Sequence, residues 1–210
     1  MKKVLVVVAN PKPEEHSVSR KAGSAFLKAY QEKYPNHEVK VLDLFENPIQ
    51  GLDGDVLGAW GVLGGGGAFE DLTPAQQKKV AEHGQVTEEF MAADVYVFVN
   101  PLWNFTVPAE LKQYVDAMMI AGKTFQYTEQ GPQGMLENKK AVHIQAAGGF
   151  YSQGPAADLE MGHRYMKNIL GFIGVSDVTP ILIEGTNAGR TPEELAADID
   201  QQVVKVAAAI

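Results

Sequence analysis

The sequence predicts an α/β fold built around one parallel sheet of five strands, and three observations support this prediction. Two apolar runs, at residues 4–8 and 95–99, are continuous instead of alternating, which is typical of strands covered on both faces. Segments with apolar residues at helical spacing separate the predicted strands, as in βαβ units. The chain has 210 residues, 45% of them hydrophobic, and shows no linker or repeat, so we expect a single domain over residues 1–210.

Strands and helices are expected to alternate along the chain. The predicted strands cover residues 4–8, 37–44, 95–99, 139–146 and 178–183, and the predicted helices cover about 17–34, 73–93, 108–121 and 158–170, with a last helix from 191. Ser17 and Thr73 are good N-caps for two of these helices. Residues 37–44 alternate between polar and apolar, which indicates a strand at or near an edge, and residues 124–136 indicate a small hairpin. The whole is expected to be a three-layer sandwich with the strand order 2-1-3-4-5.

Residues 46–71 lose this periodicity. They contain four separate glycines and the run 64–67, but no Gly-Lys-Ser/Thr follows and no strand precedes that run, so it is not a phosphate-binding loop. A long structureless segment in a compact domain is usually functional or mobile. We expect a mobile glycine-rich flap at about 46–71, anchored by Trp60 and Phe69; a disordered surface insertion is the alternative.

Three loops at the carboxyl ends of predicted strands carry residues suited to binding. In the first, residues 10–19, Asn10 follows the strand, and Ser17, Val18 and Ser19 start a helix. Hydroxyls and free N–H groups at a helix N-terminus suit a phosphate, although ordinary capping by Ser17 is an alternative.

The second loop, at residues 101–105, is stiffened by proline and rich in flat side chains. Pro101 and Leu102 lead into Trp103 and Phe105, whose faces are apolar, and into Asn104, whose amide both donates and accepts. This combination suits a planar heteroaromatic ring with polar edges; core residues that close the end of the sheet are the alternative reading.

The third loop, at Ala147, Gly148 and Gly149, lets a backbone approach a ligand closely. In the order 2-1-3-4-5 the first and third strands flank the switch point and the fourth lies beside the third, so the three loops converge. Together they describe a pocket for flavin mononucleotide (FMN), with sites for its phosphate, its ring face and its polar edge.

Composition disfavours several other classes of function. The net charge of −8 argues against a nucleic-acid binder and against an anionic membrane surface. There is no cysteine, so disulfides, thiolate metal sites and a cysteine nucleophile are excluded. No window has the length of a membrane span, and the apolar run at 4–9 is too short for a secretory core, so we expect a cytoplasmic protein.

No protein-borne catalytic group stands out. The five histidines are not at metal-binding spacing, so we expect no metal site, and His143 is interpreted as a satisfied histidine of a strand. There is no Gly-x-Ser-x-Gly motif. The lack of a catalytic acid, base or nucleophile fits chemistry carried by a cofactor.

Several blocks resemble the FMN-dependent NADH:azoreductases, also described as quinone reductases, of the Bacillus type. The blocks lie at residues 101–105, 108–116, 122–134, 148–149 and 170–174. The resemblance spans essentially the whole chain, and the first three blocks carry its specificity. It implies a flavodoxin-like fold, a homodimer with noncovalent FMN near the interface, and NADH or NADPH as the electron donor. It also implies reduction of quinones and azo compounds by a ping-pong two-electron mechanism.

The resemblance also implies residue roles. Ser17, Val18 and Ser19 are expected to hold the phosphate, residues 102–105 to border the isoalloxazine ring, and residues 147–149 to line its polar edge. The expected substrate-side aromatic residues, some of them from the partner subunit, are Trp60, Phe125, Tyr127, Tyr151 and Phe172.

Two departures and two alternatives accompany this reading. Many members carry serine and arginine before the paired glycines, where this chain has Ala146 and Ala147. The flap varies in the family, which leaves the substrate range open. The alternatives to the enzyme are a flavodoxin-like electron carrier without its own small-molecule substrate, and a scaffold or binding module without flavin.

Overall fold

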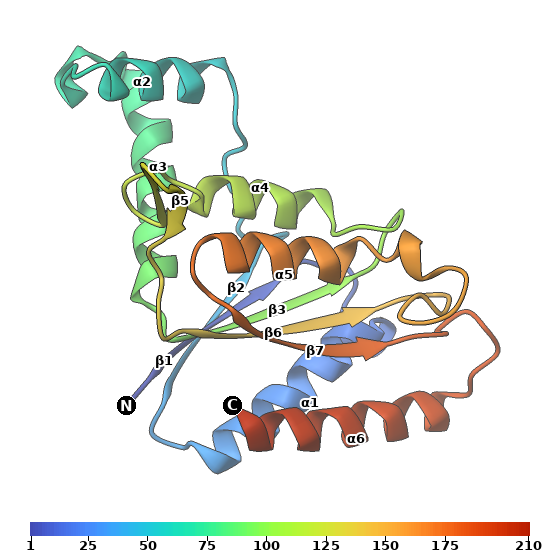
Figure 1. Cartoon of the computed structure of the whole chain (residues 1–210). Coiled ribbons are helices and arrows are strands. Elements are labelled where there is room, and N and C mark those ends of the chain that lie inside the picture. The colour runs from blue at the N-terminus through green and yellow to red at the C-terminus, as the bar shows by residue number, and fades with distance from the viewer.

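Five parallel strands form the central sheet of the computed structural model, which describes all 210 residues (Figure 1). The strands are β1 (Lys3–Val8), β2 (Glu38–Asp43), β3 (Val95–Pro101), β6 (Lys140–Ala146) and β7 (Asp177–Ile183), in the spatial order β2-β1-β3-β6-β7. Val6 pairs with Val41 on one side and with Val97 on the other, and every pairing in this sheet is parallel. The predicted order 2-1-3-4-5 is therefore confirmed for the five strands of the sheet.

Helices flank both faces of the sheet (Figure 1). The helices α1 (Val18–Lys33) and α6 (Pro192–Ala209) pack on one face, and α3 (Pro74–Ala92), α4 (Ala109–Met118) and α5 (Gly162–Phe172) pack on the other. Val4 and Val6 belong to the hydrophobic core under α1 and α6, whereas Leu5 and Val7 belong to the core under α3, α4 and α5. Both faces of β1 are buried, which explains why its sequence is continuously apolar.

The segment expected to be a flap without regular structure contains a helix, so the expectation that it is structureless was wrong, whereas its mobility stays a prediction. Helix α2 (Gly54–Gly64) and a 3₁₀ turn (Phe69–Asp71) lie there, and Figure 1 shows α2 projecting from the body on the end of α3. The Asp53 side chain accepts a hydrogen bond from the Val56 N–H at 3.0 Å and so caps α2. Val56 and Ala59 are buried, and the Trp60 ring stands edge-on to that of His83 at 5.5 Å. Packing on α3 thus overrides the low helix propensity of glycine.

The remaining elements lie close to their expected positions. A hairpin of β4 (Phe125–Thr128) and β5 (Gly131–Gly134) follows α4, as predicted. Helix α5 begins about four residues later than predicted, because a 3₁₀ turn (Ala157–Leu159) precedes it, and another 3₁₀ turn (Glu14–His16) precedes α1. No helix of this chain has the length and apolar character that a membrane crossing requires.

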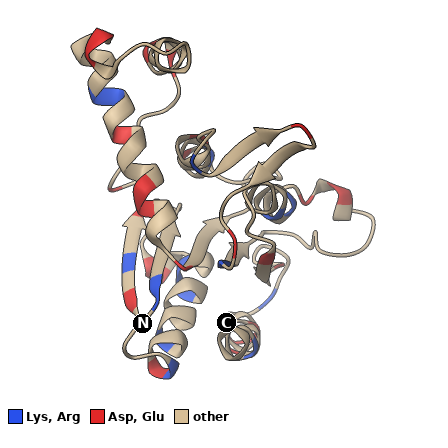
Figure 2. Ribbon diagram, turned by 60° about the vertical axis from the view of Figure 1, so that its left-hand side comes forward, with Lys and Arg blue, Asp and Glu red and all other residues tan.

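Charged residues are interspersed over the molecule. Figure 2 shows acidic and basic residues together on several of the helices. Several of them form ion pairs between elements, such as Lys40 with Glu89 and Lys123 with Glu88, both at 2.7 Å.

Candidate functional site

A cavity of about 250 Å³ opens where β1, β3 and β6 end. Its lining residues are Asn10, Lys12, His16, Ser17, Val18, Ser19, Pro101, Leu102, Trp103, Ala146, Gly148, Thr186 and Asn187. Eight of the twelve predicted cofactor residues line it, whereas Asn104, Phe105, Ala147 and Gly149 stand beside it in the same loops. The expected convergence of three loops is therefore seen in the structure.

Unpaired hydrogen-bond donors define one end of the cavity. The N–H groups of Val18 and Ser19 have no acceptor within the protein, as expected for the first turn of α1. Asn10 is buried and its Nδ2 donates to Ser17 Oγ at 2.7 Å and to Ser19 Oγ at 3.0 Å. Ser17 Oγ also accepts from the Arg20 N–H at 3.2 Å. An anion at this helix start would therefore meet several donors and the positive end of the helix dipole.

The two serine hydroxyls are turned into donors by these contacts. A hydroxyl has one proton and two acceptor sites, and both acceptor sites of Ser17 Oγ are already used. Ser19 Oγ lies 3.3 Å away, so only one proton can be shared between the two groups. At least one hydroxyl proton is left to donate into the cavity, which suits a phosphate.

The aromatic platform stands on a strained turn. Asn104 and Phe105 have φ values of 47° and 66°, which L-residues other than glycine rarely adopt. The turn is closed by hydrogen bonds between Trp103 and Thr106 at 2.9 and 3.0 Å. The Met161 N–H binds the Phe105 carbonyl at 2.9 Å, so contacts with the start of α5 hold the strained backbone in place. Trp103 and Phe105 remain 39% and 40% exposed, so they are available to a ligand and are not core residues.

A fourth loop, which the sequence reasoning missed, supports the glycine loop. After β7, the N–H groups of Gly185, Thr186 and Asn187 donate to the carbonyls of residues 149, 147 and 148 at 2.9, 3.1 and 3.0 Å. A Cβ at Gly148 would lie 2.9 Å from Asn187 Nδ2, so a larger residue there would have to displace the Asn187 side chain. The sequence did contain an indication of this loop, because residues 184–190 follow the carboxyl end of a predicted strand, as the other three loops do.

Two cavity residues near the helix start were also missed. Lys12 and His16 line the cavity beside the serines, and the Lys12 N–H donates to Asn10 Oδ1 at 3.0 Å. Their positive or donor groups add to the anion-binding character of this end. Both residues lie within the predicted first loop. The sequence alone did not show that they face the cavity, whereas the prolines and acidic residues of the same loop face solvent.

The predicted substrate-side aromatics fall into two separate groups. Tyr151 stands edge-on to Phe105 at 5.8 Å and so lies at the platform. Trp60, Phe125 and Tyr127 instead line an apolar cavity of about 630 Å³ beyond the other end of α4, and the Phe172 ring lies 5.0 Å from that of Phe125. Within one chain, the structure brings only Tyr151 to the candidate cofactor site. We call the second cavity the arm groove, because α2 and α3 form one of its walls.

A histidine pair joins β6 to α5: His143 is buried and His163 is half-buried. His143 Nε2 is 2.8 Å from Asn100 Oδ1, and its Nδ1 is 3.1 Å from His163 Nδ1. Because the amide oxygen accepts, His143 Nε2 donates and its Nδ1 accepts from His163. Burial lowers the pKa of His143 to about 3, and the neighbouring His163 adds to the effect. The interpretation of His143 as a satisfied histidine of a strand is confirmed, and the chain contains no cluster of three or more potential metal ligands.

The groups of this site match the parts of FMN. Free N–H and hydroxyl donors suit its phosphate, the exposed faces of Trp103 and Phe105 suit its ring system, and the backbone of residues 147–149 suits its polar edge. The fold, the strand order and the convergent loops together define a flavodoxin-like α/β protein. A family model described as "flavodoxin-like fold" matches residues 2–208, and the chain belongs to this family.

Individual relatives narrow this class. The chain is 49% identical over 199 residues to the FMN-dependent NADH:quinone oxidoreductase of Geobacillus kaustophilus, with 94% of each chain covered. It is 50% identical over 188 residues to FMN-dependent NADH:quinone oxidoreductase 3 of Bacillus anthracis, with 90% of this chain and 89% of the relative covered.

Solved structures agree with these relatives. An FMN-dependent NADH-azoreductase from Bacillus anthracis in complex with FMN has a TM-score of 0.93 at 34% identity, covering 100% of this chain and 99% of that one. An azoreductase from another strain of that species has a TM-score of 0.92 at 39% identity, with both chains fully covered. The resemblance that the sequence blocks indicated is confirmed.

Proposed function

We propose that this chain is an FMN-dependent NADH oxidoreductase that reduces quinones and azo compounds in two-electron steps. The observation that carries the proposal is the convergence of unpaired phosphate donors, an exposed aromatic platform and a glycine loop in one cavity. Relatives of 49–50% identity that are named FMN-dependent NADH:quinone oxidoreductases support it.

Twelve residues of the chain would bind the cofactor. Asn10, Ser17, Val18 and Ser19 would hold or orient the phosphate, Pro101, Leu102, Trp103, Asn104 and Phe105 would border the ring, and Ala147, Gly148 and Gly149 would meet its polar edge. When bound, FMN would supply the redox chemistry, namely hydride uptake from NADH and two-electron transfer to the acceptor. The chain itself supplies binding, orientation and exclusion of water.

We further propose a ping-pong order, in which NADH leaves before the quinone or azo compound binds. The platform supports this order, because Trp103 and Phe105 flank one cavity at which both substrates would meet the cofactor. The names of the relatives support NADH as the donor, and NADPH is the alternative donor.

We also propose that the chain acts as a single three-layer domain over residues 1–210, in the cytoplasm, and as a homodimer. The arm groove supports the dimer, because a large exposed apolar surface is typical of an interaction site. Tyr127 is 75% exposed at its rim. In a dimer of this kind, the groove of one subunit would bring Trp60, Phe125, Tyr127 and Phe172 toward the platform of its partner.

Anaerobic mixing of the FMN-loaded protein with NADH, and then with a quinone, tests the proposed function directly. NADH is expected to remove the flavin absorbance and the quinone to restore it.

A further inference from the structure

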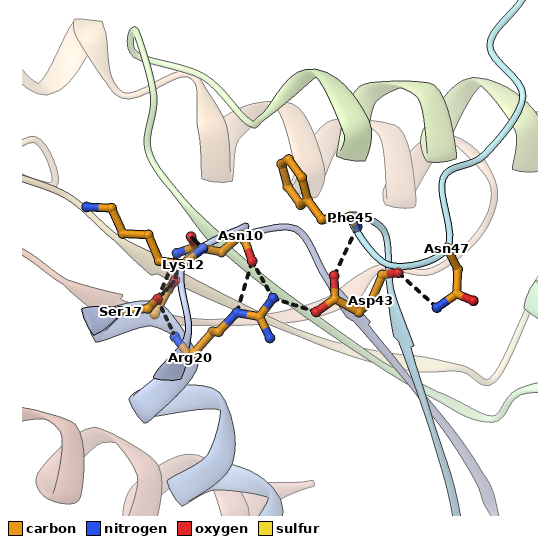
Figure 3. Close-up of polar contacts among 8 residues, drawn as sticks. Asn10, Lys12, Ser17, Arg20, Asp43, Phe45 and Asn47 are labelled. Carbon is orange, nitrogen blue, oxygen red and sulfur yellow. Dashed lines mark hydrogen bonds and ion pairs between the residues drawn. The ribbon is translucent and has the colours of Figure 1, made fainter. Parts of the chain in front are cut away.

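The only arginine of the first loop and helix start does not face the candidate phosphate site. Arg20 lies in the first turn of α1, but it is not among the residues that line the cavity. Its Nε donates to the Asn10 carbonyl at 2.9 Å, its Nη2 contacts the same oxygen, and Nη2 also pairs with Asp43 Oδ2 at 2.5 Å. Figure 3 shows the guanidinium held between Asn10 and Asp43.

These contacts tie three elements to the phosphate end of the cavity. Asp43 is the last residue of β2, Asn10 follows β1, and Arg20 belongs to α1. The carboxylate of Asp43 is 90% buried, and its Oδ1 accepts the Phe45 N–H at 2.9 Å, so its position is fixed by the backbone after β2. The Arg20 guanidinium therefore connects a fixed carboxylate to the main chain of Asn10.

The position of Asn10 in turn determines how the hydroxyls of Ser17 and Ser19 are oriented. Its Nδ2 supplies the two hydrogen bonds that turn the hydroxyls of Ser17 and Ser19 into donors. A shift of the Asn10 backbone moves that amide and changes the direction in which both hydroxyl protons point. Such a shift would reach the phosphate without any direct contact between Arg20 and the ligand.

We propose that the Arg20–Asp43 pair is a positioning device for the FMN phosphate, acting through Asn10 on the hydroxyls of Ser17 and Ser19. The proposal rests on the proposed function, because it takes FMN as the ligand. In this proposal Arg20 does not bind the phosphate itself. A positioning role and a ligand role for Arg20 predict changes of opposite sign in the FMN Kd when Asp43 is replaced.

The decisive variant is Asp43→Asn, which keeps an oxygen for the Phe45 N–H but removes the anionic partner of Arg20. If Arg20 were a ligand, releasing it would tighten FMN binding, and the loss of a nearby negative charge would act in the same direction. A positioning role gives the opposite result: we expect the FMN Kd to rise about tenfold while the riboflavin Kd stays within about twofold. Riboflavin lacks the phosphate, so it reports whether the ring part of the site is still formed.

The variant Arg20→Gln removes the cationic partner of the same ion pair. We expect the same selective loss of FMN affinity, and no further loss in the double variant, because the two residues act as one unit. Lys79→Gln is the matched control, since Lys79 forms ion pairs with Asp53 and Asp55 and is as exposed as Arg20, at 23% against 22%. It lies on α3 beside α2 and is expected to leave both Kd values unchanged.

Fluorescence titration of purified apoprotein with FMN and with riboflavin provides the readout. Tighter or unchanged FMN binding by Asp43→Asn overturns the positioning role. Equal loss of both flavins also overturns it, because the pair would then support the fold as a whole. If the wild-type protein binds neither flavin, the proposed function itself is wrong, and that result is distinct from the other two.

Discussion

Phe105 shows at the scale of one residue how the platform is built. Its φ of 66° is unfavourable for a bulky L-residue and costs on the order of 1–3 kcal/mol. The hydrogen bond from Met161 and the closed turn between Trp103 and Thr106 hold that conformation. A strained turn that leaves two aromatic rings exposed is consistent with a ligand platform, and we take the strain as part of the site.

Replacing Trp103 tests the platform. In Trp103→Ala we expect the FMN Kd to rise about tenfold, because a flat aromatic face against a planar ring is worth about 1–3 kcal/mol. Flavin fluorescence gives the affinity, and the absorbance spectrum reports the change in surroundings. Phe69→Ala, at a side chain of similar exposure in the 3₁₀ turn after α2, is the control. An unchanged affinity and spectrum for Trp103→Ala would remove this residue from the pocket.

His143 makes stability depend on pH. Its pKa is lowered to about 3 by burial, whereas the unfolded value is about 6.5. The unfolded chain therefore binds one more proton than the folded chain between these values. The free energy of unfolding falls as pH drops from about 6.5, by up to about 1.4 kcal/mol per pH unit from this residue.

The variant His143→Gln removes this contribution. Urea unfolding between pH 7 and 5 is expected to show a shallower dependence of the unfolding free energy on pH than in the wild-type protein, by about one proton. An identical slope in both proteins would show that His143 is not buried in its neutral form.

Single residues could be predicted where a pattern accompanied them. Ser17 was placed by its capping position and Trp103 by its strand-end loop, and both line the cavity. Arg20, Asp43 and His163 could not be placed, because their partners lie 10 to 23 residues away and depend on the packing of separate elements. Sequence spacing gives the order of such residues, but not their contacts.

At the scale of elements, α2 shows that helix propensity alone does not predict which segments are helical. Its glycines predicted a flap, yet Asp53 caps it and Lys79 pairs with both Asp53 and Asp55 from α3. The side-chain hydrogen bond to Lys79 lowers the pKa of Asp53 below its usual value. A helix stabilised by a neighbour is not recognisable from its own composition. The hairpin β4–β5, whose alternation is local, was recognisable.

The arm groove belongs to this scale, because α2, α3 and the hairpin form it together. If it is a subunit interface, Tyr127→Glu is expected to weaken the dimer on the order of a hundredfold, since burying an unpaired carboxylate costs about 2–5 kcal/mol. Sedimentation velocity at low micromolar concentration measures the change. Val204→Glu, at an apolar residue of α6 that is 67% exposed against 75% for Tyr127, is the control and is expected to remain dimeric.

Two outcomes would contradict this use of the groove. A wild-type protein that sediments as a monomer would remove the proposed homodimer. A dimer that survives Tyr127→Glu but dissociates in Val204→Glu would place the interface on the face covered by α6.

At the scale of the whole molecule, the sheet was the most predictable feature. Continuous apolar runs identified β1 and β3, and the alternation of residues 37–44 identified β2 as an edge strand. Because the strand order fixes which carboxyl ends are neighbours, the convergence of three loops followed from it. The fourth loop and the remote position of the arm groove required the three-dimensional structure.

The most direct measurement is a stopped-flow experiment without air on the FMN-loaded protein. Mixing with NADH is expected to remove the flavin absorbance near its visible maximum, and a quinone added afterwards is expected to restore it. Restoration after all the NADH has been consumed would support a ping-pong order. A protein that binds FMN but keeps its absorbance in NADH would contradict the proposed enzyme and favour an electron carrier.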